Sequence, residues 1–362
     1  MVVLALLATA AAVTAAPSAL CSTALQVAPD LHCAPAIYGV ALAPDAELAA
    51  NLARYAHEAE GRFATHFDQP IAPYVVFSIP PAPPRQALNE AGFQTVLPWP
   101  APQAIDASIR DRVTEQTRQF AVGMNLSADQ TEQVIARALS QLPTPASLAA
   151  IDAGMMPHEL GHLWTHKAFW NAPDNAEGEE APRHYGSPAP DWLDEAAGIL
   201  LEDAPTTDQR RAHFKTLMAG GFVPAVGAGI DAPFLLDLEG FLSREHPGLA
   251  RAATGLDTAR ASGGVAVAFT PAGQTASGPP NGLETLFYIQ TRAFTDFLIQ
   301  TSGRQTIIAD ITAALSQRPL SQRALPQGQD FPDWLSVHGT AYGLPASLPA
   351  LTTAWQTYAT SL

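Results

Sequence analysis

The sequence is poor in cysteine and in basic residues. Only two cysteines occur in 362 residues, Cys21 and Cys33, and no second pair lies near them. A cysteine-ligated metal site is therefore excluded. Lysine and arginine together number 19 against 34 acidic residues, which gives a formal net charge of −15. Because phosphate binding needs a basic face, this composition argues against a nucleic-acid partner. An acidic chain is better suited to metal cations or basic substrates.

Residues 1–16, MVVLALLATAAAVTAA, are small or apolar throughout but too few to span a bilayer comfortably. They fit the apolar region of a secretory signal, although a basic start is missing; an alanine-rich buried helix is the alternative. We expect no stable membrane span and a location in the medium, the periplasm or the cell envelope. There Cys21 and Cys33 most simply form a disulfide near the mature N-terminus. The bulky Leu20 disfavours a lipid-carrying Cys21.

Few stretches have the β-branched and aromatic composition of a strand. The segment YVVFSI (74–79) predicts one, and the proline-rich residues 80–103 after it are expected to form a loop. Capping residues are expected at Ser127 and at Asp191, the latter with Asp194 three residues on. Apolar spacing and these caps predict helices over residues 44–67, around 105–113, 127–142, from 191, 283–316 and 348–358. The fold class is therefore α+β and mostly helical, with a small N-terminal sheet.

The segment MPHELGHLW (156–164) contains two histidines four residues apart. On a helix these positions share one face, so the imidazoles of His158 and His162 can reach one zinc ion. Glu159 lies beside that face, where it can act as a general base. The alternative is an ordinary helix with satisfied histidines. Pro157 requires the helix to begin there or to bend.

A catalytic zinc site needs a third protein ligand and one open position. His166 lies four residues beyond His162, but three successive turns of a straight helix cannot converge on one ion, so His166 is expected at the surface or beside a ligand. His184, in the proline-rich segment 171–190, is a weaker alternative. Glu195 is the stronger candidate, because the intervening loop is long enough to bring its helix alongside the first.

The segments HELGH and PDWLDEAAG resemble those of the gluzincin metallopeptidases, in particular the peptidase MA-like bacterial proteins and, more distantly, aminopeptidase N-type enzymes. Those proteins share a Trp-x-x-Glu-(Gly/Ala) segment whose glutamate is the third zinc ligand, and Trp192, Glu195 and Ala196 match it. The resemblance spans residues 45–362 and is specific at these two segments. It implies a zincin-like two-lobed fold.

The segment YIQTRAFTDFLIQTSG (288–303) extends the resemblance. In the relatives a tyrosine opens such a helix and donates a hydrogen bond to the oxyanion of the tetrahedral intermediate. That position is Tyr288 here; a half-buried core tyrosine is the alternative, and His246 is the rival oxyanion donor.

Two departures from the family pattern matter. The Gly-Ala-Met-Glu-Asn strand of true aminopeptidases is not visible, so the sequence does not support an exopeptidase. Ile199 stands where some gluzincins have an aspartate that orients a zinc-bound histidine. Glu202 or Asp194 is then expected to take that role.

The sequence therefore predicts a secreted zinc metallopeptidase that acts on a peptide or protein. One Zn²⁺ would be held by His158, His162 and Glu195, a zinc-activated water would attack the peptide bond with Glu159 as general base, and Tyr288 would stabilise the oxyanion. The alternatives are a catalytically silent zinc-containing binding protein and a hydrolase of non-peptide amides or cell-wall peptides. Glu159 disfavours the silent protein, since a structural zinc site needs no general base.

The expected organisation divides the chain into a signal peptide and three further segments. After residues 1–16, an N-terminal segment with the disulfide covers 17–43. The catalytic lobe with the zinc helices covers 44–205, and a C-terminal helical lobe covers 206–362. The substrate cleft is expected between the lobes, with residues 262–282 as a lid.

Overall fold

The structure is a computed structural model. It describes residues 17–79, 81, 83–142, 144–170, 189–223, 234–247, 283–317 and 327–362. The predicted signal peptide (1–16), His184 and the predicted lid (262–282) lie outside these residues. Within them the chain is mostly helical with a small mixed sheet, which confirms the predicted fold class in this coarse form.

A four-stranded sheet lies near the N-terminus, in the order β1–β2–β3–β4. The first pair is antiparallel and the other two pairs are parallel. The strands are β1 (His32–Pro35), β2 (Gly39–Ala43), β3 (Tyr74–Ile79) and β4 (Thr95–Pro100). A second sheet consists of two short parallel strands, β5 (Phe222–Val223) and β6 (Leu235–Leu236).

Alternating side chains of the four-stranded sheet enter two separate cores. Val75 and Phe77 pack with residues of α1 (Pro17–Val27) and α3 (Arg85–Glu90) on one face. Tyr74 and Val76 pack against α2 (Ala46–Phe67) on the other face, in the core that also receives the site-bearing helices. The period of two along the strand therefore decides which core each residue joins.

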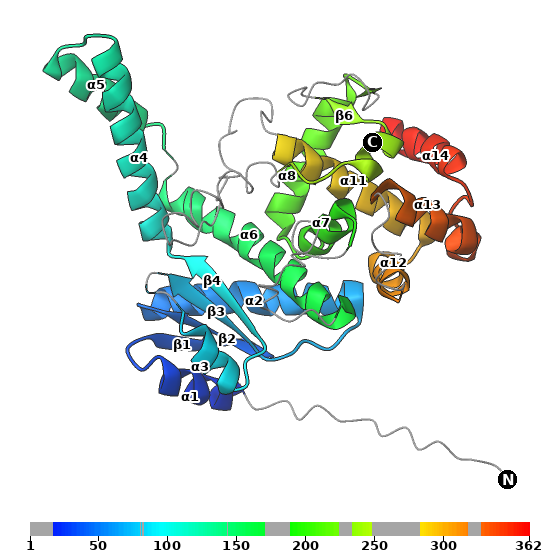
Figure 1. Cartoon of the computed structure of the whole chain (residues 1–362), viewed down its shortest axis with the longest axis horizontal. Helices are drawn as coiled ribbons and strands as arrows, with labels where there is room; N and C mark the ends of the chain where they lie inside the picture. Colours follow the sequence, from blue (N-terminus) through cyan, green and yellow to red (C-terminus); the bar gives the residue numbers. More distant parts are fainter. Residues whose placement is uncertain are drawn as a thin grey trace.

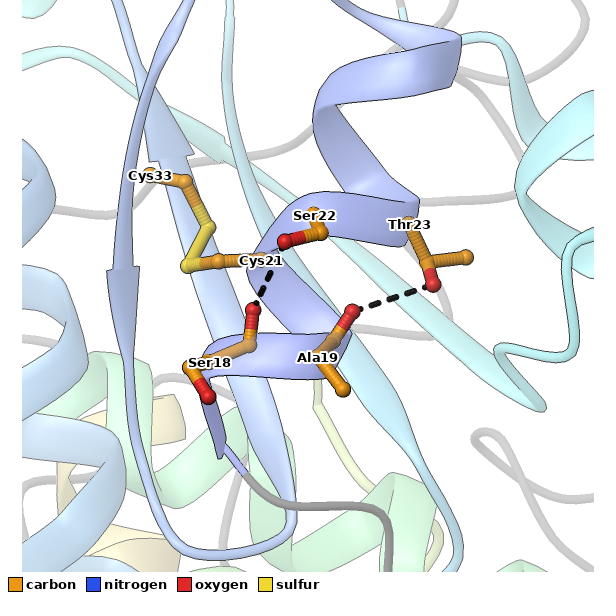
Figure 2. The surroundings of a disulfide bond; sticks show 6 residues. All are labelled: Ser18, Ala19, Cys21, Ser22, Thr23 and Cys33. Carbon is orange, nitrogen blue, oxygen red and sulfur yellow. Dashed lines mark hydrogen bonds between the residues drawn. A yellow bond between two sulfur atoms is a disulfide. The ribbon is translucent and has the colours of Figure 1, made fainter.

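The predicted disulfide is confirmed. Cys21 of α1 is bonded to Cys33 of β1, so the bridge fastens the first helix to the edge of the sheet (Figure 2). Beside it, the hydroxyls of Ser22 and Thr23 donate to the carbonyls of Ser18 and Ala19, each over 3.0 Å. The helix thus satisfies its polar side chains locally while its apolar face covers the sheet.

The expected loop over residues 80–103 is wrong, because this segment contains α3 and strand β4. The prolines that suggested a loop are tolerated at the sheet edge. The Ala101 amide donates to the Ile79 carbonyl over 2.9 Å, so the amide positions that alternate with it, Pro98 and Pro100, face away from the sheet. A proline lacks an N–H, and at those positions no ladder bond is lost.

The remaining elements are helical. They are α4 (Pro102–Gly123), α5 (Ala128–Leu139), α6 (Pro145–Thr165), the π-helical turn η1 (His166–Trp170), α7 (Asp191–Ile199), α8 (Ala204–Met218), α9 (Leu238–Ser243), α11 (Leu283–Ser302), α12 (Ile307–Ser316), α13 (Gln327–His338), the 3₁₀ turn η2 (Gly339–Tyr342) and α14 (Leu348–Ser361). The expected single helix over 283–316 is divided at Gly303, whose φ of 66° only glycine adopts readily. Among the described residues, no helix combines the length and apolar character needed to cross a membrane.

Two groups of these helices differ in their surroundings. Helix α7 packs against α6 and α11, and α11 also packs against α8. Residues of α6, α7, α8, α11, α12, α13 and α14 share the core that α2 also joins. Helices α4 and α5 form a hairpin that projects away from the sheet and from the other helices (Figure 1). Its connection is closed by a capping box, in which Ser127 and Gln130 satisfy each other's backbone amides.

Candidate metal centre

Helix α6 supplies two imidazoles to one point. It begins at a Thr144 cap and runs through the HELGH segment with Pro157 in its interior, so of the two alternatives for Pro157 the helix does not begin there. His158 and His162 lie one turn apart on the buried face, with relative exposures of 1% and 8%. Their Nε2 atoms are 3.1 Å apart. This is the shared face that the four-residue spacing predicts.

Helix α7 brings a carboxylate to the same point, and all nine of its residues are buried. One oxygen of Glu195, Oε2, lies 3.1 Å from His158 Nε2 and 3.8 Å from His162 Nε2. One ligand atom from each residue can be chosen so that all lie within 4.8 Å of one another. The structure therefore brings together the three predicted ligands as a group that could hold a metal ion.

The start of α7 corrects one prediction. Pro190 occupies the N-cap, and Asp191 is the first helical residue rather than the cap. The Asp191 side chain instead accepts a hydrogen bond from the backbone amide of His246, which follows α9. An acidic residue in the first turn favours the helix in either position, so sequence alone does not distinguish them.

Two glycines permit the close approach of α6 and α7. A Cβ at Gly161 would lie 2.5 Å from the carbonyl oxygen of Ala197 and 2.9 Å from the Cα of Gly198. A Cβ at Gly198 would lie 2.7 Å from His158 Nε2. Real Cβ atoms do not come this close to other atoms, so both helices need glycine here for the imidazoles and Glu195 to meet.

Both histidines of the group have an acidic neighbour on the ring nitrogen away from Glu195. His158 Nδ1 is 2.9 Å from Glu202 Oε1, and His162 Nδ1 is 3.3 Å from Asp194 Oδ2. Both residues that were expected to replace the missing aspartate at Ile199 thus lie beside a histidine, Glu202 within hydrogen-bond geometry of His158 and Asp194 at ion-pair distance from His162 without a well-oriented hydrogen bond. Such partners fix the tautomer and ring orientation of metal-binding histidines.

Two further histidines lie beside this group. His166 Nε2 is 3.3 Å from Asp194 Oδ1, so it contacts the carboxylate behind His162, as expected for a residue beside a ligand. His246 is 2% exposed, and its Nε2 is 3.3 Å from Glu195 Oε1. The sequence proposed His246 only as an oxyanion donor, and its contact with Glu195 was not anticipated. Residues 195 and 246 are far apart in the sequence, so their contact cannot be inferred from local spacing.

Charge interactions dominate the pKa values of this cluster. Burial alone would lower the pKa of both imidazoles, but Glu195 and Glu202 raise the pKa of His158 to about 9, and Asp194 and Glu195 raise that of His162 to about 10. Burial opposes ionisation of Glu195, yet His162 and His158 lower its pKa. A cation bound here would replace the imidazolium protons, since only neutral imidazole coordinates a metal.

The contacts of Glu195 provide a test of whether a metal fits. Neither of its buried oxygens has a well-oriented hydrogen bond among the described residues, although three imidazoles surround it at 3.1–3.8 Å. An ionised carboxylate buried without such bonds is costly. A dication would compensate it, and two imidazoles with one carboxylate suit a zinc ion with a position left for water. The residues therefore fit a metal ion in composition and in placement.

The two predicted catalytic side chains lie at this cluster. Glu159 is partly exposed, and its charge contributes to the raised pKa of His162. The ring of Tyr288, from α11, meets the ring of His158 edge-on with centroids 5.6 Å apart. It also lies 5.4 Å from the ring of His246. Both Glu159 and Tyr288 are more exposed than the three candidate ligands.

A buried arginine completes the arrangement and was missed in the sequence. Arg210 of α8 binds Glu202 through two nitrogens, and its Cζ lies 4.9 Å from the centroid of the Tyr288 ring. Among these partners, the Arg210 guanidinium and the imidazole of His158 lower the pKa of Glu202 to about 2 against the effect of burial. Nothing in the local pattern around Arg210 distinguishes it from the exposed Arg211 beside it.

Comparison with known proteins gives no relative: no family model, no curated protein and no solved structure matches this chain.

Proposed function

We propose that this protein is a secreted zinc-dependent metallopeptidase of the gluzincin type. The proposal rests on one observation, the convergence of His158, His162 and Glu195 from two helices on one buried point. The motif residue Glu159 follows His158 in the chain and its charge raises the pKa of His162, and the ring of the matched tyrosine Tyr288 meets the ring of His158. The Cys21–Cys33 bridge supports a location where disulfides persist.

In this proposal His158, His162 and Glu195 hold one zinc ion, which when bound acidifies a water molecule and polarises the substrate carbonyl. Glu159 takes a proton from the attacking water and returns it to the leaving amide nitrogen. The phenol of Tyr288 donates a hydrogen bond to the developing oxyanion, an interaction that can contribute several kcal/mol to lowering the barrier. The peptide would lie between a zincin-like N-terminal lobe and the C-terminal helices.

Replacing Glu159 by glutamine tests the assignment, because the amide keeps the shape and cannot accept a proton. We expect the variant to bind zinc as the wild type does and to lose about 10²- to 10⁴-fold of kcat on a casein-type substrate. Glu132→Gln is the matched control, since Glu132 is exposed on the remote helix α5. It should retain full activity.

The outcomes separate the alternatives. If zinc-loaded wild type hydrolyses no member of a broad peptide library, a zinc-containing binding protein is the better interpretation. If it cleaves peptidoglycan fragments or simple amides and not plain peptides, the substrate class changes while the roles of Glu159 and the ligands stand. If purified protein binds no zinc, the proposed function is wrong.

A further inference from the structure

Arg210 contacts both the support of a metal ligand and the proposed oxyanion donor. Its Nε donates to Glu202 Oε2 over 2.6 Å and its Nη2 donates to Glu202 Oε1. That carboxylate in turn lies 2.9 Å from His158 Nδ1. Glu202 is buried, and Arg210 is 6% exposed. A two-pronged ion pair in such surroundings has one geometry, so the orientation of His158 depends on the position of Arg210.

The same guanidinium lies against the Tyr288 ring, with Cζ 4.9 Å from the ring centroid. The ring in turn meets His158 edge-on at 5.6 Å between centroids. Three helices contribute to this closed loop of contacts: α6 through His158, α8 through Arg210 and α11 through Tyr288. Movement of the guanidinium would therefore shift the imidazole and the phenol together.

We propose that Arg210 is a positioning residue that sets the orientation of His158 through Glu202 and the position of Tyr288 through its flat face. The inference rests on the proposed function for the role of the phenol, but not for the role of the imidazole. Arginine suits both tasks, because its planar fork binds a carboxylate with two nitrogens and its face stacks on an aromatic ring. Lysine retains the charge and provides neither geometry.

The first experiment measures zinc affinity by competition with a coloured chelator, with no substrate present. We expect Arg210→Lys and Glu202→Gln each to weaken zinc binding by about 10- to 100-fold. The double variant should be little weaker than the more affected single variant, because both changes release the same imidazole. Tyr288→Phe should bind zinc as the wild type does.

The matched control is Arg211→Lys. Arg211 follows Arg210 on α8, but its guanidinium forms a two-pronged ion pair with Asp296 at 2.8 and 3.0 Å and its side chain is 48% exposed. The same chemical change there leaves the metal centre untouched, so zinc affinity should not change. If Arg210→Lys also binds zinc with wild-type affinity, Arg210 does not position His158.

The second experiment measures peptide hydrolysis at saturating zinc. Arg210→Lys should lower kcat about tenfold with little change in KM, because the phenol acts on the transition state. In a Tyr288→Phe background, Arg210→Lys should lower kcat less than twofold. An equal loss of kcat with and without the phenol would overturn the link to Tyr288.

Two provisions keep the results interpretable. If Arg210→Lys does not fold, as judged by circular dichroism, Glu202→Gln replaces it, since it preserves shape and is expected to show the same zinc loss and the same dependence on Tyr288. If wild type with bound zinc is inactive on every peptide, the proposed function fails. The zinc-affinity comparison then still decides whether Arg210 positions His158.

Discussion

Helix α7 and the α4–α5 hairpin are opposite extremes of the same molecule. All nine residues of α7 are buried, including Asp191, Asp194 and Glu195. In the hairpin, the described side chains are nearly all at the surface, with Ala121 and Ile135 as the buried ones. Large apolar side chains are exposed at its tip; these are Phe120 at 61%, Val122 at 71% and Met124 at 59%. The candidate ligand Glu195 lies on the buried helix α7.

The difference shows what holds each region in shape. The buried acids of α7 lie against imidazoles and a backbone amide from other segments, in surroundings where each charge interaction is strong. The hairpin relies on its own capping box and on exposed pairs such as Arg110–Asp106, 2.7 Å apart with side chains 42% and 27% exposed, and such pairs contribute little. Substitutions near α7 should therefore have larger effects on stability and zinc affinity than substitutions in the hairpin.

The largest effect on the metal centre is expected from Gly161→Ala, which adds one methyl group between α6 and α7. The nearest atoms are backbone atoms of Ala197 and Gly198, which cannot rotate away. We expect a loss of about 1–3 kcal/mol in the free energy of unfolding, with zinc affinity reduced at least tenfold. Urea unfolding and chelator competition measure the two effects. Unchanged zinc affinity would show that the helix spacing does not set the site.

A pH-dependent effect, on stability alone, is expected at Asp152, on the part of α6 that precedes the site. It is 3% exposed and accepts a hydrogen bond from Trp99 Nε1 over 3.1 Å. Burial raises its pKa to about 7 despite that hydrogen bond. The folded protein thus holds this proton more tightly than the unfolded chain does. Asp152 therefore destabilises the fold progressively as pH rises from about 4 to about 7, by up to about 1.4 kcal/mol per pH unit.

Asp152→Asn should remove that slope and retain an acceptor for Trp99. The variant should lose less stability than the wild type between pH 5 and pH 8, and should be the more stable protein at pH 8. Urea titrations at both pH values measure this. Asp129→Asn on exposed α5 controls for the loss of a negative charge. Parallel pH profiles for wild type and Asp152→Asn would contradict the assignment.

A local effect is expected from Ser127→Ala at the start of α5. The change removes the serine oxygen that accepts from the Gln130 amide, which should cost about 1 kcal/mol of local helix stability. Amide hydrogen exchange in α5 should accelerate about fivefold, and zinc affinity should stay at its wild-type value. A change in zinc affinity would mean that the hairpin is coupled to the site.

The smallest effect, and a stabilising one, is expected from Gly123→Ala in the last turn of α4. A Cβ there meets nothing within 4 Å, and the backbone is not in a conformation that requires glycine. Alanine should raise local helix stability by up to about 1 kcal/mol. Slower amide exchange near residue 123 would measure it. The same substitution at Gly161 is predicted to be destabilising, so the pair isolates the effect of packing.

Local pattern accounts for much of the fold and for part of the site. The spacing of His158 and His162 predicts that both imidazoles lie on one face. The Trp192–Glu195 segment predicts the Glu195 carboxylate as the third ligand. The Ser127 cap and the strand at 74–79 were also predicted. For the histidine pair, the cap and the strand, the physical cause acts within one helix or strand, where period and capping are visible in the sequence; Glu195 was predicted from the length of the preceding loop and from a resemblance to a family segment.

The features that the sequence did not reveal depend on contacts between distant segments. Arg210 lies near Tyr288, and His246 near Glu195, only because the helices pack as they do. The close approach at Gly161 likewise involves two helices, so the sequence of neither helix alone reveals it. The strand at 95–100 was missed for a different reason, since prolines oppose a strand in general and are harmless only at an edge.

Strand β4 has a consequence for association between molecules. Its outward side presents Pro98 and Pro100, which have no N–H to offer, and the carbonyl of Val96, which already accepts from Arg85 Nη1 at 3.1 Å. An incoming strand would find two prolines and a charged side chain where it needs a regular ladder. The sheet is thus protected on this side against extension by another copy, a common defence of sheet proteins against aggregation.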